Sequence, residues 1–323
     1  MKHRLMLYSS SLVSIFVIIT MISLSSCTKD KSQHVRIAYL PSSSCLPLFV
    51  AVEKGYFKEA GIDVELLRFG ATNDALNAVL AGRADGTPGF GISSFCAIEA
   101  KTPGSLKIYM PCAEDEHNYA NNLLVPAKSP IQSLEQLSGK KVGTFTSSTQ
   151  TLYLKLIMAK ALPAGKEWQI VQVEDKLQLQ ALAANQFDAL FAIEPIGTKA
   201  VSEGVARVLV ANPRGKYLYS PFPAGANCFS SEFIKSKPEL AAKVAQVFVK
   251  AVKDIRNDPR AARMILTKYA SIEPAIADKV GLYTWWLPGE EDWTAVQHLA
   301  NLLSENKLIS TNVQVKDMIF NLH

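Results

Sequence analysis

The sequence predicts an α/β protein whose strands and helices alternate and which folds into two lobes. Strand and helix patterns follow one another as far as residue 210, the order typical of parallel sheets with covering helices. The chain has 323 residues, which is more than a single small core accommodates. Its last third changes to mostly helical patterns, beginning with an amphipathic stretch at 238–256.

Residues 35–69 predict a strand, a turn, a helix and a second strand. Apolar and polar residues alternate at 35–39, which indicates a half-buried strand. Ser42, Ser43 and Ser44 then offer hydroxyl groups where the next helix begins. Open α/β sheets bind ligands at the carboxyl ends of their strands. We therefore expect this turn to be one wall of a ligand site.

The N-terminus predicts an exported, lipid-anchored protein. Two basic residues precede the mostly apolar stretch 12–24, and Leu24-Ser25-Ser26-Cys27 resembles the bacterial lipobox. We expect 1–26 to be a lipoprotein signal peptide, Cys27 to carry the lipid and 27–33 to form a tether. The protein would then be held at the cell membrane, facing the periplasm or the cell exterior. A plain signal peptide cut nearby, with Cys27 incidental, is the alternative.

Composition and cysteine spacing exclude several functional classes. Apolar residues make up 48% and charged residues 20%, which is typical of a globular chain. The net charge of +5 comes without a dense run of lysine and arginine, so no nucleic-acid surface is expected. Cys45, Cys96, Cys112 and Cys228 permit two disulfides in three pairings, between which the sequence does not decide. Their spacing predicts no zinc site, and no metal or cofactor is expected.

Further candidate ligand contacts follow from helix starts, polar strand ends and aromatic loops. Helix N-termini present unpaired N–H groups and partial positive charge, which suit an anion or a carbonyl-rich ring. Ordinary N-capping by the hydroxyl residues is the alternative. Phe90 and Phe222 are placed in loops rich in glycine and proline, where an aromatic ring can stack on a planar ligand. The candidates beyond the first turn are Phe90, Ser93, Ser94, Asn118, Thr146, Ser147, Ser148, Thr149, Glu194 and Phe222.

Five segments together resemble one protein family. The first, PLFVAVEKGYFKEAGIDVE, resembles the signature of the solute-binding proteins grouped with sulfonate, taurine, nitrate and thiamine-pyrimidine binders. The others agree in order and spacing, and the resemblance covers about residues 35–270. They are the Ala-Gly-Arg-Ala-Asp run from Ala81, residues 133–143, residues 187–190 followed by Glu194-Pro195, and residues 233–238.

The resemblance implies a type II periplasmic-binding-protein fold, with two lobes, two crossovers and a ligand cleft between the lobes. Lobe one would comprise 34–121 plus 223–323, and lobe two 122–222. The implied role is to deliver a small solute to an ABC importer, whose permease and ATPase would be the partners. The protein would act as a monomer and not as an enzyme.

The residue types of the cleft bear on the solute. None of the predicted cleft loops contains an arginine fork for a strong acid, whereas carboxylates and aromatic rings are present. This favours a neutral or amino-bearing planar compound, such as a pyrimidine related to thiamine. A sulfonate, taurine or nitrate is the alternative, because helix N-termini alone can hold anions.

An enzyme of the same fold is a further alternative. Pyrimidine-precursor synthases resemble this family but have a dense cysteine cluster, whereas Cys96, Cys112 and Cys228 are scattered. The sequence contains no catalytic-triad order, His-Glu-x-x-His, Walker loop or Rossmann fingerprint.

Replacing Cys27 tests the lipid anchor. Because the acyl chains would be attached to its sulfur, Cys27→Ala should release the exported protein from membranes into the soluble fraction. Fractionation followed by immunoblotting measures this, with Cys228→Ala as the matched control. Persistence of the Cys27→Ala protein in the membrane fraction would contradict the assignment.

Overall fold

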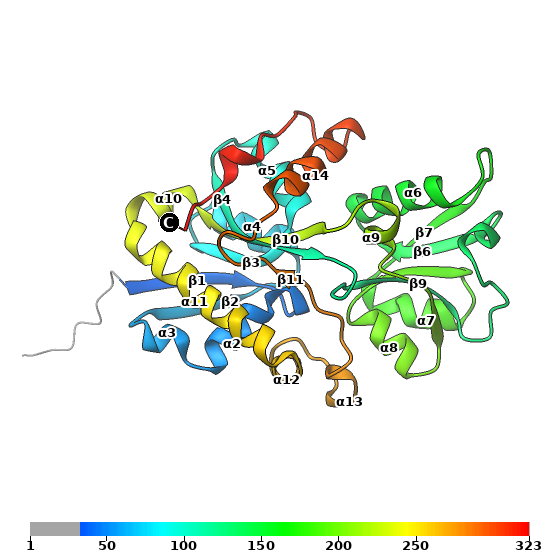
Figure 1. Cartoon of the computed structure of the whole chain (residues 1–323), viewed down its shortest axis with the longest axis horizontal. Helices are drawn as coiled ribbons and strands as arrows, with labels where there is room; N and C mark the ends of the chain where they lie inside the picture. Colours follow the sequence, from blue (N-terminus) through cyan, green and yellow to red (C-terminus); the bar gives the residue numbers. More distant parts are fainter. Residues whose placement is uncertain (1–32, 323) are drawn as a thin grey trace, which may run out of the picture.

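Two mixed β-sheets, each with helices packed on both sides, form the two lobes of the protein (Figure 1). The computed structural model describes residues 33–322. The predicted signal peptide, Cys27 and most of the predicted tether lie outside the described residues. Within 33–322, no helix combines the length and the apolar character that crossing a bilayer requires.

Lobe one contains a six-stranded sheet in the order β11-β4-β10-β3-β1-β2. Two separate segments of the chain form this sheet, the first from residue 34 to 114 and the second from residue 222 onward. Its strands are β1 (His34–Tyr39), β2 (Asp63–Arg68), β3 (Gly86–Gly91), β4 (Leu106–Glu114), β10 (Phe222–Ser230) and β11 (Thr284–Trp285). Its helices are η2 (Ser43–Cys45), α2 (Leu46–Glu53), α3 (Tyr56–Glu59), α4 (Thr72–Leu80), α5 (Ile92–Lys101), α10 (Ser231–Ser236), α11 (Pro238–Asn257), α12 (Pro259–Tyr269), α13 (Pro274–Ala277), α14 (Trp293–Glu305) and η5 (Val315–Met318).

Lobe two contains a five-stranded sheet in the order β7-β6-β8-β5-β9. One continuous segment of the chain supplies all of it. Its strands are β5 (Asn121–Pro126), β6 (Lys141–Phe145), β7 (Gln169–Val173), β8 (Ala189–Ile193) and β9 (Ala206–Ala211). Its helices are η3 (Leu134–Leu137), α6 (Ser148–Ala161), η4 (Asp175–Leu177), α7 (Gln178–Ala183), α8 (Ile196–Ser202) and α9 (Pro213–Tyr217).

The expectation of parallel sheets is wrong for the strands next to the crossovers. Strands β1, β2 and β3 pair in parallel, as do β6, β7 and β8. However, β10 runs antiparallel to β3 and β4, and β5 runs antiparallel to β8 and β9. The chain enters each of these two strands from the other lobe. They are therefore not joined to a neighbouring strand by the helical connection that makes successive strands parallel. Phe222 begins β10 and Phe90 lies in β3, so the prediction of loops at both positions is also wrong.

Aromatic side chains from α3, β4, β10 and α11 form one cluster in the core of lobe one. Tyr109 and Phe229 stack with ring centroids 4.5 Å apart, and Phe248 meets the Tyr109 ring edge-on at 6.3 Å. Phe57 packs edge-on against Phe248 from the other side at 6.2 Å. Such pairs add to the burial of large apolar surfaces, so this cluster holds α11 against the sheet.

Gly89 allows the serine turn to pack directly on β3. Its φ of +66° lies in the left-handed region, and a Cβ there would come within 2.2 Å of the backbone oxygen of Ser44. Its backbone N–H donates to Oδ1 of the buried Asn227 at 3.1 Å. The backbone of β3 therefore approaches the Ser44 turn more closely than any side chain would permit.

A methyl group at Gly89 should be strongly destabilising. We expect Gly89→Ala to lower the free energy of unfolding by at least about 2 kcal/mol, because it combines left-handed backbone strain with overlap against a backbone oxygen. Urea unfolding measures the change. Gly70→Ala is the control, since a Cβ at Gly70 meets nothing within 4 Å. Equal stability of the two variants would contradict the expected effect.

Candidate functional site

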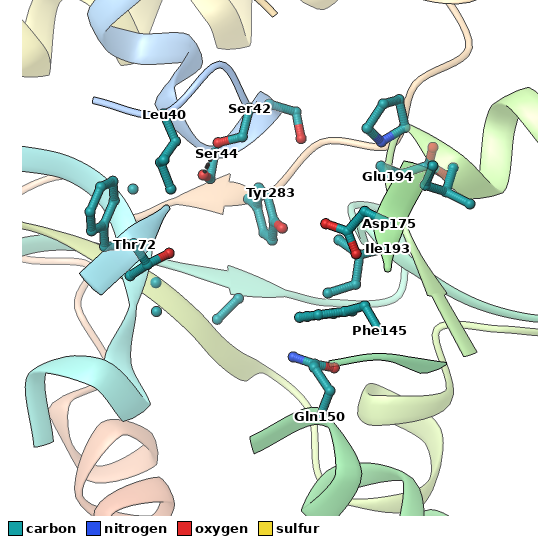
Figure 2. A pocket seen from close by; sticks show the side chains of 18 of the residues that line it. Leu40, Ser42, Ser44, Thr72, Phe145, Gln150, Asp175, Ile193, Glu194 and Tyr283 are labelled. Carbon is teal, nitrogen blue, oxygen red and sulfur yellow. Dashed lines mark hydrogen bonds between the residues drawn. The ribbon is translucent and has the colours of Figure 1, made fainter. Parts of the chain in front are cut away.

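A cavity of about 380 Å³ lies between the two lobes. Lobe one contributes the serine turn after β1, the end of β3, part of β10 and Tyr283 before β11. Lobe two contributes the ends of β6 and β8 and residues from η4, α6, α7 and α9. Figure 2 shows Leu40, Ser44 and Thr72 facing Phe145 and Asp175 across this space. Each wall comes from a different lobe, so the relative position of the lobes shapes the cavity.

The cavity lies where parallel strands of both sheets end. The chain turns into it after β1, β6, β7 and β8, and most of these turns lead into a helix or a 3-10 turn. Carboxyl ends of neighbouring parallel strands share one edge of a sheet, so segments far apart in the sequence meet there. Residues in the first turns of α6, α7 and α8 line the cavity, and the first turn of a helix carries N–H groups without intrahelical partners.

Five of the predicted contacts line this cavity. Ser42, Ser43 and Ser44 form part of one wall, Phe90 lies at the end of β3, and Glu194 follows β8. The hydroxyl groups of Ser42 and Ser44 are 2.8 Å apart and bond to each other. The Ser42 hydroxyl also donates to Sγ of Cys45 at 3.8 Å, and it makes no side-chain cap of the turn that follows. Each hydroxyl oxygen can still accept a further hydrogen bond.

Six further predicted residues line a wider groove next to the cavity. The groove has a volume of about 970 Å³ and shares Thr72 and Phe145 with the cavity. Ser147 is the N-cap of α6, where its Oγ accepts a hydrogen bond from the Gln150 N–H at 3.4 Å. Capping and solute contact therefore compete for this hydroxyl. The six residues are Ser93, Ser94, Thr146, Ser147, Ser148 and Thr149.

Asn118 and Phe222 line neither space. Asn118 donates from Nδ2 to the hydroxyl of Thr284 at 3.0 Å, which ties the first crossover to β11. Phe222 is fully buried, with its ring 5.1 Å from that of Tyr153 and 5.2 Å from that of Tyr219. Both residues support the walls rather than face the cavity.

Several lining residues were not among the predicted contacts. Gln150, Asp175 and Gln178 lie within one helical turn of a strand end or a helix start. They would have been predicted if the candidates had included every polar residue within one turn of each such position. Arg214 also follows a strand end and a helix start, since β9 ends at Ala211 and α9 begins at Pro213 with Asn212 as its N-cap. Only Tyr283, just before β11, belongs to a segment with no signal of this kind. The predicted cleft loops do lack arginine, but α9 brings Arg214 to the cavity, and that weakens the expectation drawn from its absence.

Arg214 and Glu114 form an ion pair buried behind the cavity. Nη2 of Arg214 lies 2.6 Å from Oε1 of Glu114, and their side chains are only 5% and 0% exposed. Glu114 also accepts hydrogen bonds from the Ala120 N–H at 3.0 Å and from Nδ2 of Asn121 at 2.7 Å. Paired charges that are also hydrogen-bonded are the form in which burial is tolerated.

Arg214 retains an unused donor. Its Nε is buried without a hydrogen-bond partner within the described residues. The guanidinium carbon lies 5.4 Å from the centroid of the Phe222 ring, so one face of the group is covered. Among the residues that line the cavity, the amide of Gln150 also has an unpartnered buried atom, Oε1. Unpartnered buried polar atoms are rare in folded proteins, and two of them at one cavity indicate a missing partner.

Glu194 is a carboxylate held in a largely desolvated position. Its Oε2 accepts a hydrogen bond from the Thr198 N–H at 3.0 Å, and Oε1 accepts one from Nδ2 of Asn122 at 3.3 Å. Burial raises the pKa of Glu194 above the usual value, although these hydrogen bonds oppose the shift. Partial desolvation raises the pKa of Asp175 as well.

The cysteines provide neither disulfides nor a metal site in the described chain. Cys45, Cys96, Cys112 and Cys228 are all buried as free thiols. Burial raises the pKa of Cys45 to about 11 and that of Cys96 to about 12, so these thiols stay protonated at neutral pH. Across residues 33–322, no three histidine, cysteine or acidic side chains gather closely enough to hold a metal ion.

The raised pKa of Glu194 predicts a pH-dependent stability difference. The folded state holds the Glu194 proton more tightly than the unfolded chain, so this residue's contribution to stability falls as pH rises above the ordinary value of 4.5. Between pH 4.5 and 8, the melting temperature of Glu194→Gln should therefore rise relative to that of the natural protein, and the difference should grow with pH. Calorimetric scans at each pH measure the difference, with the exposed Glu203→Gln as control. A difference that shrinks with rising pH would contradict the assignment.

Comparison with known proteins identifies the family. The family model described as NMT1/THI5 like matches residues 42–262. A protein of Bacillus subtilis (strain 168), whose name provisionally assigns it to aliphatic sulfonate binding, is 23% identical over 317 residues. That alignment covers 96% of this chain and 93% of the relative.

Two solved structures share the fold across most of their length. The alkanesulfonate-binding protein SsuA from Xanthomonas axonopodis pv. citri, bound to MOPS, has a TM-score of 0.71 at 19% identity and covers 90% of this chain and 98% of its own. The periplasmic aliphatic sulphonate binding protein SsuA from Escherichia coli has a TM-score of 0.72 at 20% identity and covers 89% and 97%. The predicted fold class is thereby confirmed, and the chain belongs to the NMT1/THI5-like family.

Proposed function

We propose that the protein is the extracytoplasmic solute-binding component of an ABC importer and that the cavity between its lobes holds the solute. The observation that carries this proposal is a cavity of about 380 Å³ whose walls come from two separate lobes and whose lining includes buried polar atoms without partners. This volume falls in the usual range for sites that hold small organic molecules. The names of the sulfonate-binding relatives support the same role.

The proposed contacts divide into two groups. Ser42, Ser43, Ser44, Phe90 and Glu194 contact the solute from the cavity walls. The second group lines the adjoining groove and contacts a solute that extends into it, or one held after the lobes approach each other. This group consists of Ser93, Ser94, Thr146, Ser147, Ser148 and Thr149.

For the solute we propose a small planar compound that is neutral or bears an amino group. Phe90, Phe145 and Tyr283 provide aromatic surfaces, and the carboxylates of Asp175 and Glu194 can accept hydrogen bonds from an amino group. A pyrimidine related to thiamine has these properties. Support for it comes from the cavity alone, because the names of the cited relatives refer to sulfonates.

A sulfonate, taurine or nitrate is the second candidate. The names of the relatives favour it. Arg214 is the single cation among the described residues that line the cavity, and Glu114 pairs with it. Helix N-termini directed at the cavity would add partial positive charge.

The proposed role in transport includes the remaining expectations. The lipid on Cys27 would hold the protein at the membrane as a monomer, where a permease and its ATPase receive the solute. The protein would bind without turnover. Because one fold supports both binding and catalysis, the pyrimidine-precursor synthase activity is the alternative that experiment has to exclude.

Native mass spectrometry of gently purified protein tests the proposed function. We expect a noncovalent small-molecule adduct that is lost on denaturation and returns unchanged when the released solute is added back. Uptake of that solute by cells should require the gene for a neighbouring permease. Chemical conversion of the released solute by the protein would favour the enzyme, and the absence of any adduct or binding would contradict the proposal.

A further inference from the structure

The geometry of Arg214 leaves one donor of its guanidinium, Nε–H, without a partner in the described chain. Nη2 is held by Glu114 at 2.6 Å, the Phe222 ring covers one face, and Nε has no partner although it is buried. The side chain is 5% exposed and Arg214 lines the cavity. A rigidly held donor of this kind is suited to fix an acceptor atom, because little side-chain entropy remains to be lost on binding.

We propose that Arg214 anchors the solute through its Nε donor, and that Glu114 makes the anchor select an uncharged acceptor over an oxyanion. This inference rests on the proposed function, which it deepens by assigning the residues that set the charge of the solute. The acceptor would be a carbonyl, sulfonamide or ring nitrogen. Glu114 acts as a specificity-determining residue although it does not line the cavity.

The balance of charges at the cavity favours a neutral solute over an anionic one. Glu114 is fully buried and neutralises Arg214 at close range. The other ionisable carboxylates at the cavity are Asp175 and Glu194, and no lysine or histidine lines it within the described chain. An anionic solute would therefore add a negative charge beside two carboxylates, where the one full positive charge is already compensated. The helix starts contribute only about half a charge each near their ends.

The side-chain amide of Gln150 provides a second contact to the solute, beside that of Arg214. It lies in the first turn of α6, which packs against α9, the helix that holds Arg214. Its side chain points toward the cavity (Figure 2), the residue is 7% exposed, and Oε1 is buried without a partner. A guanidinium donor and an amide on neighbouring helices fit a solute that carries an acceptor and a donor side by side, as a carboxamide or sulfonamide does.

Pairs of probes that differ in charge but not in shape test this inference. The full-length protein is titrated by calorimetry with benzenesulfonamide and benzenesulfonate, and then with benzamide and benzoate. We expect the neutral member of a pair to bind at least tenfold more tightly than the anion. Glu114→Gln should shift this ratio at least tenfold toward the anion, because the positive charge of Arg214 is then uncompensated. Glu203→Gln, an exposed change of the same type, should leave the ratio unchanged.

A second variant avoids the buried ion pair, in case Glu114→Gln fails to fold. Gln150→Met should weaken binding of the neutral probe at least tenfold without lowering the melting temperature, because the buried amide oxygen Oε1 has no hydrogen-bond partner to lose. Gln180→Met, an exposed change on α7, is the matched control. Unchanged binding by Gln150→Met would overturn the proposed role of the amide.

Two results would overturn the inference as a whole. One is a natural protein that binds the anion as tightly as the neutral member of each pair. The other is binding of none of the four probes. If a retained solute is still found by native mass spectrometry in either case, the proposed function stands and only the assignment of Arg214 and Glu114 fails.

Discussion

The buried ion pair between Glu114 and Arg214 is the interaction on which the relation of the two lobes depends. Glu114 is the last residue of β4, where the chain leaves lobe one, and Arg214 lies in α9, shortly before the chain returns. Asn121 joins the same network, since its Oδ1 accepts from the Arg214 N–H at 3.2 Å and its Nδ2 donates to Glu114. Removing one partner of a buried ion pair typically lowers the free energy of unfolding by about 3–5 kcal/mol. Because the pair and Asn121 lie beside both crossovers, one polar cluster holds the two connections between the lobes.

This cluster links stability to recognition. Burying a polar group costs free energy unless the group is hydrogen-bonded. The network supplies hydrogen bonds to both carboxylate oxygens of Glu114, but it leaves Nε of Arg214 without a partner. The cavity also holds Glu194, whose pKa is raised because burial removes the carboxylate from water. Sites that are prepared for a ligand commonly keep such unfavourable groups in the unliganded state, because the ligand supplies the missing interactions.

Local pattern predicted much of the fold but less of the site. The alternation around Val35 and the serine turn predicted β1 and the cavity wall that follows it, because strand and turn preferences are encoded by adjacent residues. The direction of β5 and β10 was not predictable in this way, since it depends on where the chain enters each sheet. Phe222 illustrates the same limit, because its glycine- and proline-rich surroundings indicated a loop although it begins a strand.

The sequence by itself determined the lobe-building units, the family signature and the serine turn at the cavity, because each depends on short-range spacing of residue types. Only the tertiary structure decided that Arg214 and Tyr283 meet Gln150 and Asp175 at one cavity. It also decided that Glu114 compensates the charge of Arg214. Burial and pairing of charges are set by contacts across a hundred residues of chain, and no local pattern records them.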